Sequence, residues 1–467
     1  MEWTNRRLGH GGPVSARALR RCVDPLRLRA SRIVAGAPGP VRIAGVPYPV
    51  GAQARHTLVC GADSAGRYAL LADLVAQLRA RRQRCVILDG TGRYTEAFFD
   101  AGRDVLLNPL DERAPAWSPL LEAREARDFV AMAAALLPQQ ADPLQRIRAE
   151  AAVRVFARRA LKLWRGGVRS NRALANHLLD TDVQQELRAL QWPELDAADP
   201  DNALAVGAQL WDMASTLGLL PVGGRPFVIR DWVLADRESD GGCLFLNSHG
   251  TWGGSMRALM AAWLEVAFDA LHGRGRGDTA RVWVILDDIT AVNAVPGLKA
   301  ALAGSPPFGG CVVLGVPVFA ALHQVYGTTH AAKIADLCAT RVMFWAGGTT
   351  ETTRFAERLG RSDMGPSADA WTDGAGAHGG AGAITLQGYP RLNVSPIEIQ
   401  CLKEREGYLK FPGSWPAARF RIRDGKRHRA APRFVPRLPA YRGGPGDPPG
   451  GGNGRLNGGA TGHFNWV

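Results

Sequence analysis

The chain has 467 residues, of which 46% are hydrophobic and 21% charged, so it is long enough to bury a large core and is typical of a globular protein. Its 57 basic and 43 acidic residues give a formal net charge of +14, which favours an acidic partner such as nucleic acid or a membrane surface, although a GC-rich genome would also enrich arginine. Its longest uncharged apolar run, residues 308–322, is too short and too interrupted by glycine and proline to span a bilayer, and no signal peptide precedes it, so we expect a cytoplasmic protein.

Residues 1–45 form a basic lead, and the first regular pattern is HTLVCGADSAGRYALLADLVAQL, residues 56–78. Here an apolar strand runs into a glycine turn and then into a helix with one leucine-rich face. Two further apolar runs, residues 84–90 and 104–108, are bounded by turn residues, as is typical of parallel strands buried on both faces. This order of strand, helix and strand predicts an α/β fold with a doubly wound sheet.

The character changes at residues 117–222, where alanine- and leucine-rich segments have helical periodicity and no convincing strand occurs. Apolar strand patterns then resume at residues 242–248, 281–288, 310–316 and 341–346. The sequence therefore predicts an all-α domain, residues 117–222, inserted between two parts of one α/β domain, residues 46–116 and 223–422.

The end of the chain is basic, and residues 423–467 are also rich in glycine and proline, which predicts a disordered tail. Such a tail can bind DNA phosphates through counterion release or bind an anionic lipid surface, and a merely solvated tail is the third interpretation. The candidates for DNA binding are Arg419, Arg421, Arg423, Lys426, Arg427 and Arg429. The seven cysteines show no C-x-x-C spacing, so we expect reduced, mostly buried thiols and no metal site.

The glycine turn at Gly61 and Gly66 has the spacing of a phosphate-binding loop, but a chain with 55 glycines in 467 residues contains that spacing roughly six times by chance. The flanking strand and helix strengthen the interpretation, because backbone N–H groups and a helix N-terminus then point at one place. A second strand, VWVILDD, ends in Asp287 and Asp288, where magnesium-binding and water-activating acids would stand.

Four longer runs carry a more specific resemblance. They are GRDVLLNPLDERAPAWSP (102–119), FGGCVVLG (308–315), CATRVMF (338–344) and EIQCLKEREGYLKFPGSWPAARFRI (398–422). In this order they resemble TraD-type coupling proteins of conjugative type IV secretion systems, which belong to the FtsK/HerA-like motor ATPases. The resemblance extends from about residue 12 to 422 and implies a RecA-like P-loop NTPase whose nucleotide-binding domain is formed by residues 46–116 and 223–422.

The resemblance also implies ATP and Mg²⁺ as cofactors, DNA and relaxosome or secretion components as partners, and a ring of identical subunits or one shared with an active paralogue. Coupling proteins usually begin with membrane-spanning helices, whereas here the resemblance starts almost at Met1. We therefore expect either a soluble variant, peripheral at the inner membrane, or a reading frame whose start has been lost.

The loop departs from the family's pattern. Members resemble G-T-x-G-S-G-K-S, and the same eight positions here read GADSAGRY. Asp63 places a carboxylate where polyphosphate would lie, and Ser64 adds a side chain where the backbone must approach closely. Arg67 keeps the charge of the lysine but replaces a compact ammonium with a broad planar fork. Tyr68 removes the small hydroxyl that would bind Mg²⁺, an ion that demands near-ideal octahedral geometry.

The acids at the strand ends are only partly retained. After Asp287, Asp288 replaces the family's glutamate and so withdraws the carboxylate by one methylene, which misplaces a water. Asp89 ends the strand at residues 84–90, where it matches a strand-end acid of the family and fits a turn cap equally well.

Further catalytic positions are replaced as well. The arginine finger that would reach a neighbouring subunit falls on Pro306, and the glutamine that would sense the γ-phosphate falls on Pro317. A further arginine falls on Trp345, although Arg341 is retained. Because a finger alone contributes about 10³ to 10⁵ in rate, these losses together predict a protein without useful ATP turnover.

We therefore predict a TraD-like coupling-protein homologue with a degenerate nucleotide site, acting in DNA transfer as a DNA- or partner-binding subunit. Nucleotide binding without hydrolysis stays open, since Arg67 and the helix N-terminus still attract anions. The alternatives are an active DNA-translocating ATPase that tolerates Arg67 and Tyr68, and a decaying remnant without function.

Overall fold

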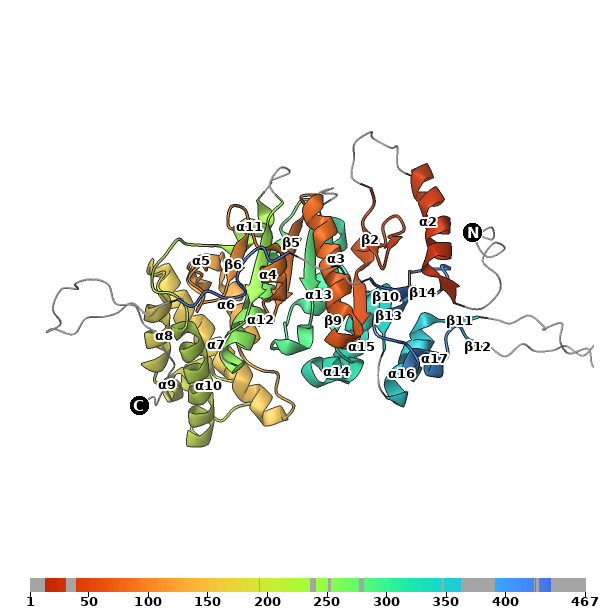
Figure 1. Ribbon diagram of the computed structural model, residues 1–467. Coiled ribbons are helices and arrows are strands. Elements are labelled where there is room, and N and C mark those ends of the chain that lie inside the picture. Colours follow the sequence, from red (N-terminus) through yellow and green to blue (C-terminus); the bar gives the residue numbers. More distant parts are fainter. Residues whose placement is uncertain are drawn as a thin grey trace, which may run out of the picture.

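The computed structural model describes residues 13–30, 39–192, 194–235, 241–250, 253–276, 281–345, 348–362, 391–423, 425 and 428–437. Its centre is a ten-stranded sheet in the order β1-β14-β13-β10-β4-β9-β8-β5-β7-β6 (Figure 1). From β10 to β6 all neighbours run parallel, while β13 and β14 add an antiparallel edge. The strands are β1 (Val14–Ser15), β4 (Thr57–Cys60), β5 (Arg84–Asp89), β6 (Val105–Leu107), β7 (Cys243–Asn247), β8 (Val282–Leu286), β9 (Gly310–Val316), β10 (Thr340–Phe344), β13 (Glu406–Lys410) and β14 (Ala418–Arg421).

The central strands are apolar along their whole length because helices cover both faces of the sheet. Along β5, Cys85 and Ile87 face one core and Val86 and Leu88 face the other. The first core contains residues of α3 (Arg67–Ala80), and the second contains residues of α12 (Gly253–His272). Every strand expected from the apolar runs lies in this sheet, so the predicted doubly wound α/β architecture is confirmed.

Shorter elements complete the α/β part of the chain. They are α2 (Ala16–Ala30), β2 (Arg42–Ile43), β3 (Val46–Pro47), α4 (Arg93–Phe98), α11 (Ile229–Leu234), α13 (Leu298–Gly304), α14 (Phe319–Tyr326), α15 (Thr328–Leu337), α16 (Thr349–Leu359), β11 (Arg361–Ser362), β12 (Arg391–Leu392) and α17 (Pro396–Gln400). No helix in the described part of the chain combines the length and apolar character that a bilayer crossing requires.

Between β6 and β7 the chain forms a helical unit at one end of the sheet (Figure 1). Its helices are α5 (Pro119–Glu122), α6 (Ala126–Leu136), α7 (Pro143–Arg165), α8 (Asn171–Leu179), α9 (Val183–Leu190) and α10 (Pro200–Gly218). Short polar side chains start several of them, as Asp142 does for α7 and Ser170 for α8, because each accepts a hydrogen bond from the first turn. Helix α6 packs on α12, so this unit shares the core on that face. The domain limits at residues 117 and 222 stay a prediction.

A buried glutamate ties the two ends of this helical unit together. The carboxylate of Glu122 accepts hydrogen bonds from Trp117 Nε1 at 2.8 Å and from the backbone N–H groups of Ile229 and, at 3.2 Å, Arg230. Burial raises the pKa of Glu122 to about 7, although these three donors oppose the rise. The folded chain therefore holds this proton to a higher pH than the unfolded chain does, where the carboxyl titrates near its ordinary value of 4.5.

The stabilisation that comes from this proton is complete below pH 4.5 and is lost as the pH rises to about 7. We expect Glu122→Gln to flatten the decline of unfolding free energy over that window by on the order of 3 kcal/mol. Urea denaturation at pH 5 and pH 7.5 measures the difference. The exposed Glu150→Gln serves as a control, and an equal flattening in both variants would contradict the assignment.

Candidate functional site

The loop after β4 is a tight turn that uses its own backbone groups. It contains one turn of 3-10 helix, η2 (Asp63–Ala65), in which Ala65 N–H donates to Ala62 O at 3.0 Å and Gly66 N–H donates to Asp63 O at 3.1 Å. Gly66 has φ +114°, and a Cβ on Gly61 would stand 2.6 Å from Cβ of Phe344, so both positions require glycine. In a working phosphate-binding loop such N–H groups face the phosphates. Here two of them are bound inside the turn.

The first side chain of α3, Arg67, reaches from the loop after β4 past β9 to the end of β8. Its Nε donates to Asp287 Oδ1 at 2.9 Å, and its Nη1 donates to the carbonyl of Gly61. The side chains of Arg67 and Asp287 are 5% and 14% exposed, so this ion pair is screened little by water. Burial raises the pKa of Asp287, and the adjacent guanidinium opposes that rise. The basic residue of the loop is therefore joined directly to the acid that would face a metal.

A second set of contacts lies at the mouth of the loop, and we call it the Arg93 latch: Arg93 of α4 with Asp63 and Tyr68. Arg93 Nη1 lies 2.6 Å from Asp63 Oδ2, and the Arg93 guanidinium carbon lies 3.6 Å from the centre of the Tyr68 ring. The Tyr68 hydroxyl donates to the carbonyl of Arg93 at 3.3 Å. Sequence reasoning identified Asp63 and Tyr68 but missed Arg93, because nothing in the turn that contains it signals a partner 30 residues earlier.

The other strand-end acids cap turns. Asp288 Oδ1 accepts from Thr290 N–H at 2.9 Å and from the Thr290 hydroxyl at 2.6 Å, and so starts η3 (Ile289–Ala291). Asp89 Oδ2 accepts from Thr95 N–H at 2.7 Å and from its hydroxyl at 2.8 Å. Burial raises the pKa of Asp89, and the Thr95 donors oppose the rise. Asp288 therefore lies beside Asp287 in sequence but has a separate structural task.

Other positions that the resemblance singled out lie apart from the loop. Arg341 pairs in register with Leu58, two residues before the end of β4, and its Nη1 donates to Arg358 O at the end of α16 at 2.9 Å. Trp345 follows β10, where its indole N–H donates to Gln400 O. Pro317 follows the carboxyl end of β9, beside the loop. Pro306 precedes the amino-terminal end of β9, on the opposite side of the sheet along the strand direction. The structure thus does not bring Arg341 to the site.

The described basic candidates are all exposed, and two of them form ion pairs. On β14, Arg419 forms an ion pair with Glu406 at 2.8 Å, and Arg421 and Arg423 lie further along the chain. Arg429 pairs with Glu96 at 2.6 Å. Lys426 and Arg427 lie outside the described residues. A groove of about 820 Å³ extends from the loop to this part of the chain, and its basic lining residues are Arg93, Arg405, Arg421, Arg423, His428, Arg429 and Arg433.

Of the expected disordered tail, residues 423–467, the structure describes only 423, 425 and 428–437, and residues 428–437 differ from the expectation; the rest lies outside the described residues. The segment 428–437 crosses the carboxyl ends of the strands at one side of the sheet, where its backbone is hydrogen bonded to Glu96, Leu110 and Glu112. The composition that predicted disorder did not reveal these partners, because they lie more than 300 residues away in the sequence.

A loop between the parallel strand β4 and a helix, acids after β8, which is separated from β4 by one strand, and an inserted helical unit define a P-loop NTPase fold with an all-α domain. The chain belongs to the family of type IV secretion-system coupling proteins, since the family model "Type IV secretion-system coupling protein DNA-binding domain" matches residues 40–423. This match confirms the predicted family.

Individual relatives agree with this assignment. The chain is 26% identical over 407 residues to coupling protein TraD of Escherichia coli (strain K12), and the match covers 85% of this chain and 56% of TraD. The chain thus spans little more than half the length of that relative. Plasmid coupling protein TrwB in complex with ADP and Mg²⁺ is 24% identical with a TM-score of 0.76, covering 92% of this chain and 96% of that chain. The sulphate complex of TrwBdeltaN70 is 25% identical with a TM-score of 0.75, and the match covers 92% of this chain and 97% of that chain.

A nucleotide and Mg²⁺ are implied by these relatives, but the residues of this chain do not fit them. The carboxylate that would face the metal, Asp287, already binds the Arg67 guanidinium. The position of the magnesium-binding hydroxyl holds the Tyr68 phenol, whose oxygen is bound to the carbonyl of Arg93. The Asp63 carboxylate adds negative charge at the mouth of the loop. We therefore assign no step of nucleotide chemistry to this site.

Proposed function

We propose that the chain acts in conjugative DNA transfer as a DNA-binding coupling-protein subunit whose nucleotide site is closed and does not turn over ATP. The observation that carries the proposal is the buried ion pair between Arg67 and Asp287. A catalytic lysine and a magnesium-facing acid must both be available to the nucleotide for phosphoryl transfer. Here the corresponding side chains satisfy each other, and the Arg93 latch covers the remaining opening.

The basic groove supports DNA as the ligand. Arg421 and Arg423 are exposed and line it, its basic residues outnumber the acidic ones (Asp63, Asp73, Glu96 and Glu404), and the chain as a whole carries a formal charge of +14. Guanidinium groups bind phosphate oxygens in a bidentate geometry, and each phosphate that is neutralised releases counterions from the DNA. Affinity in this groove is therefore expected to come from the backbone of the DNA and to depend strongly on salt.

The partners follow from the same assignment. We place the subunit in a ring, either of identical chains or shared with a paralogue that has an intact loop, in contact with relaxosome or secretion components. A cytoplasmic position at the inner membrane suits the seven unpaired cysteines and the basic surface.

Fluorescence anisotropy with a labelled duplex tests the proposal. We expect the Arg421→Gln, Arg423→Gln double variant to bind about ten-fold more weakly and to reduce the slope of log affinity against log salt by about 2. Arg419→Gln is the matched control on the same strand, and its effect is expected to be smaller because Glu406 already binds this guanidinium. Equal losses in both variants would contradict the groove, and ATP hydrolysis at the rate of an active motor would contradict the closed site.

A further inference from the structure

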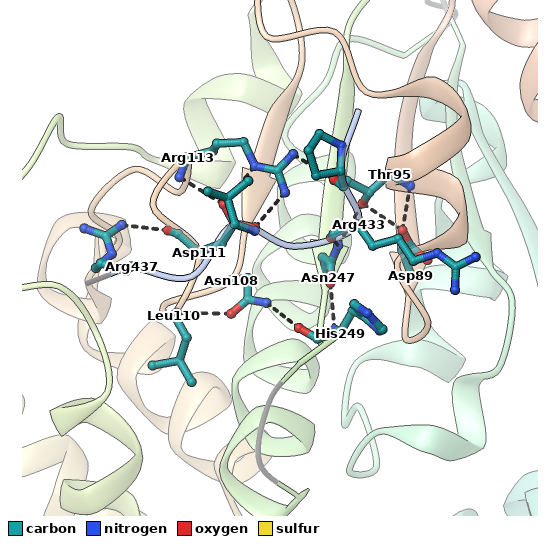
Figure 2. A network of polar contacts seen from close by, with 12 residues as sticks. Asp89, Thr95, Asn108, Leu110, Asp111, Arg113, Asn247, His249, Arg433 and Arg437 are labelled. Carbon is teal, nitrogen blue, oxygen red and sulfur yellow. Dashed lines mark hydrogen bonds and ion pairs between the residues drawn. The ribbon is translucent and has the colours of Figure 1, made fainter. Parts of the chain in front are cut away.

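Residues 428–437, which we call the C-terminal strap, cross the carboxyl ends of β5, β7 and β6 (Figure 2). At one end Ala430 N–H donates to Glu96 O at 2.7 Å. At the other, Glu112 N–H donates to Val435 O at 2.9 Å and Arg437 N–H donates to Leu110 O at 2.7 Å. In open α/β sheets this edge is where ligands bind. Part of the chain itself occupies it here.

Side chains hold the strap in one position. Glu96 of α4 receives the guanidinium groups of Arg429 at 2.6 Å and Arg433 at 2.7 Å, and hydrogen bonding from Arg433 lowers the pKa of Glu96. Asn247 Nδ2 donates to Arg433 O at 3.0 Å. A Cβ on Gly250 would stand 2.9 Å from the Phe434 ring, so the ring lies directly on that backbone. The strap therefore combines charged, backbone and packing contacts.

Helix α4 contacts both the strap and the loop. Its first residue, Arg93, forms the latch with Asp63 and Tyr68, and Glu96, one turn later, is the main anchor of the strap. A helix of six residues has too few internal hydrogen bonds to keep its position alone. The buried Tyr94 and the hydrogen bonds from Thr95 to Asp89 fix its middle to the sheet. The contacts of Arg93 and Glu96 add to this anchoring on the side of the loop and the strap.

We propose that the C-terminal strap, through Glu96, adds to the anchoring of α4 and thereby keeps the Arg93 latch closed over the loop. Coupling of this kind is reciprocal, so a chain whose strap is released opens its loop more often, and a chain whose latch is broken loosens its strap. The inference rests on the closed loop of the proposed function. The test of the coupling contains no nucleotide, so failure of the coupling can be distinguished from failure of the proposed function.

Hydrogen–deuterium exchange of the full chain tests the coupling. In Glu96→Gln, which weakens both arginine contacts, we expect the amides of residues 63–68 and 428–437 to exchange about 3- to 10-fold faster. Glu186→Gln is the matched control: the Glu186 side chain is 14% exposed, against 15% for Glu96, and binds two arginines, Arg158 at 3.3 Å and Arg159 at 2.8 Å, but lies in the helical unit. No change is expected in the loop or strap of that variant.

A second variant removes packing without changing charge. Phe434→Ala takes the ring off Gly250, and the same pair of segments should exchange faster. Faster exchange of the strap with an unchanged loop would overturn the coupling, as would unchanged exchange of both segments in both variants. Faster exchange of the loop in Glu186→Gln as well would show general destabilisation and would also overturn it.

Discussion

Replacing Asp287 with alanine is expected to lower the free energy of unfolding by about 3 to 5 kcal/mol, because the Arg67 guanidinium would stay buried without its carboxylate. An acid kept only for binding a metal would show no such loss, since its removal relieves a buried negative charge. Urea denaturation of the full chain measures the difference. The expected loss is large relative to the typical stability of a domain, about 5 to 15 kcal/mol.

The adjacent residue provides the control. Asp288→Ala removes only a turn cap, so we expect a loss of about 1 kcal/mol. Adding Arg67→Met to Asp287→Ala removes the stranded charge and is expected to restore much of the stability, which gives a coupling energy between the two positions. Similar small losses in Asp287→Ala and Asp288→Ala would contradict the buried pair.

The central fold was predictable from sequence because its strands are buried on both faces and appear as uninterrupted apolar runs. The antiparallel strands at the edge of the sheet were not predictable in this way. In β14 the pattern alternates, with Ala418 and Phe420 buried and Arg419 and Arg421 exposed, so these four residues contain no apolar run that would indicate a strand. The strap was hidden for a related reason. Its polar composition resembles that of a disordered segment, and its binding partners lie on other strands.

The site was predictable in position but not in its contacts. The strand, the glycines and the helix located the loop, and the resemblance showed which residue types had changed. That Arg67 binds Asp287 follows only from the sheet, because the two residues are 220 positions apart and are brought together by parallel strands that are not consecutive in sequence. The role of Arg93 depends in the same way on the packing of α4 beside the loop.

Restoring three side chains is expected to raise the nucleotide affinity of this loop above that of the natural chain. In the variant Asp63→Ala, Arg67→Lys, Tyr68→Ser, the carboxylate at the mouth of the loop is removed. A compact ammonium replaces the guanidinium that binds Asp287, and a small hydroxyl becomes available for Mg²⁺. At ATP concentrations about 100-fold above its dissociation constant, binding stabilises the folded state by about 2.7 kcal/mol. A thermal shift assay with ATP and Mg²⁺ against Mg²⁺ alone should therefore show a higher Tm for the variant and no change for the natural chain.

Tyr68→Phe separates the two effects of the tyrosine. It keeps the ring against which the Arg93 guanidinium lies at 3.6 Å but loses the hydroxyl bound to the Arg93 carbonyl, so the latch stays largely closed and no ATP-dependent shift is expected. A shift in the natural chain as large as that of the triple variant would mean that Arg67 and Tyr68 tolerate nucleotide. The ion pair with Asp287 would then have to open on binding, and the chain would fit the active DNA-translocating ATPase better than the closed subunit.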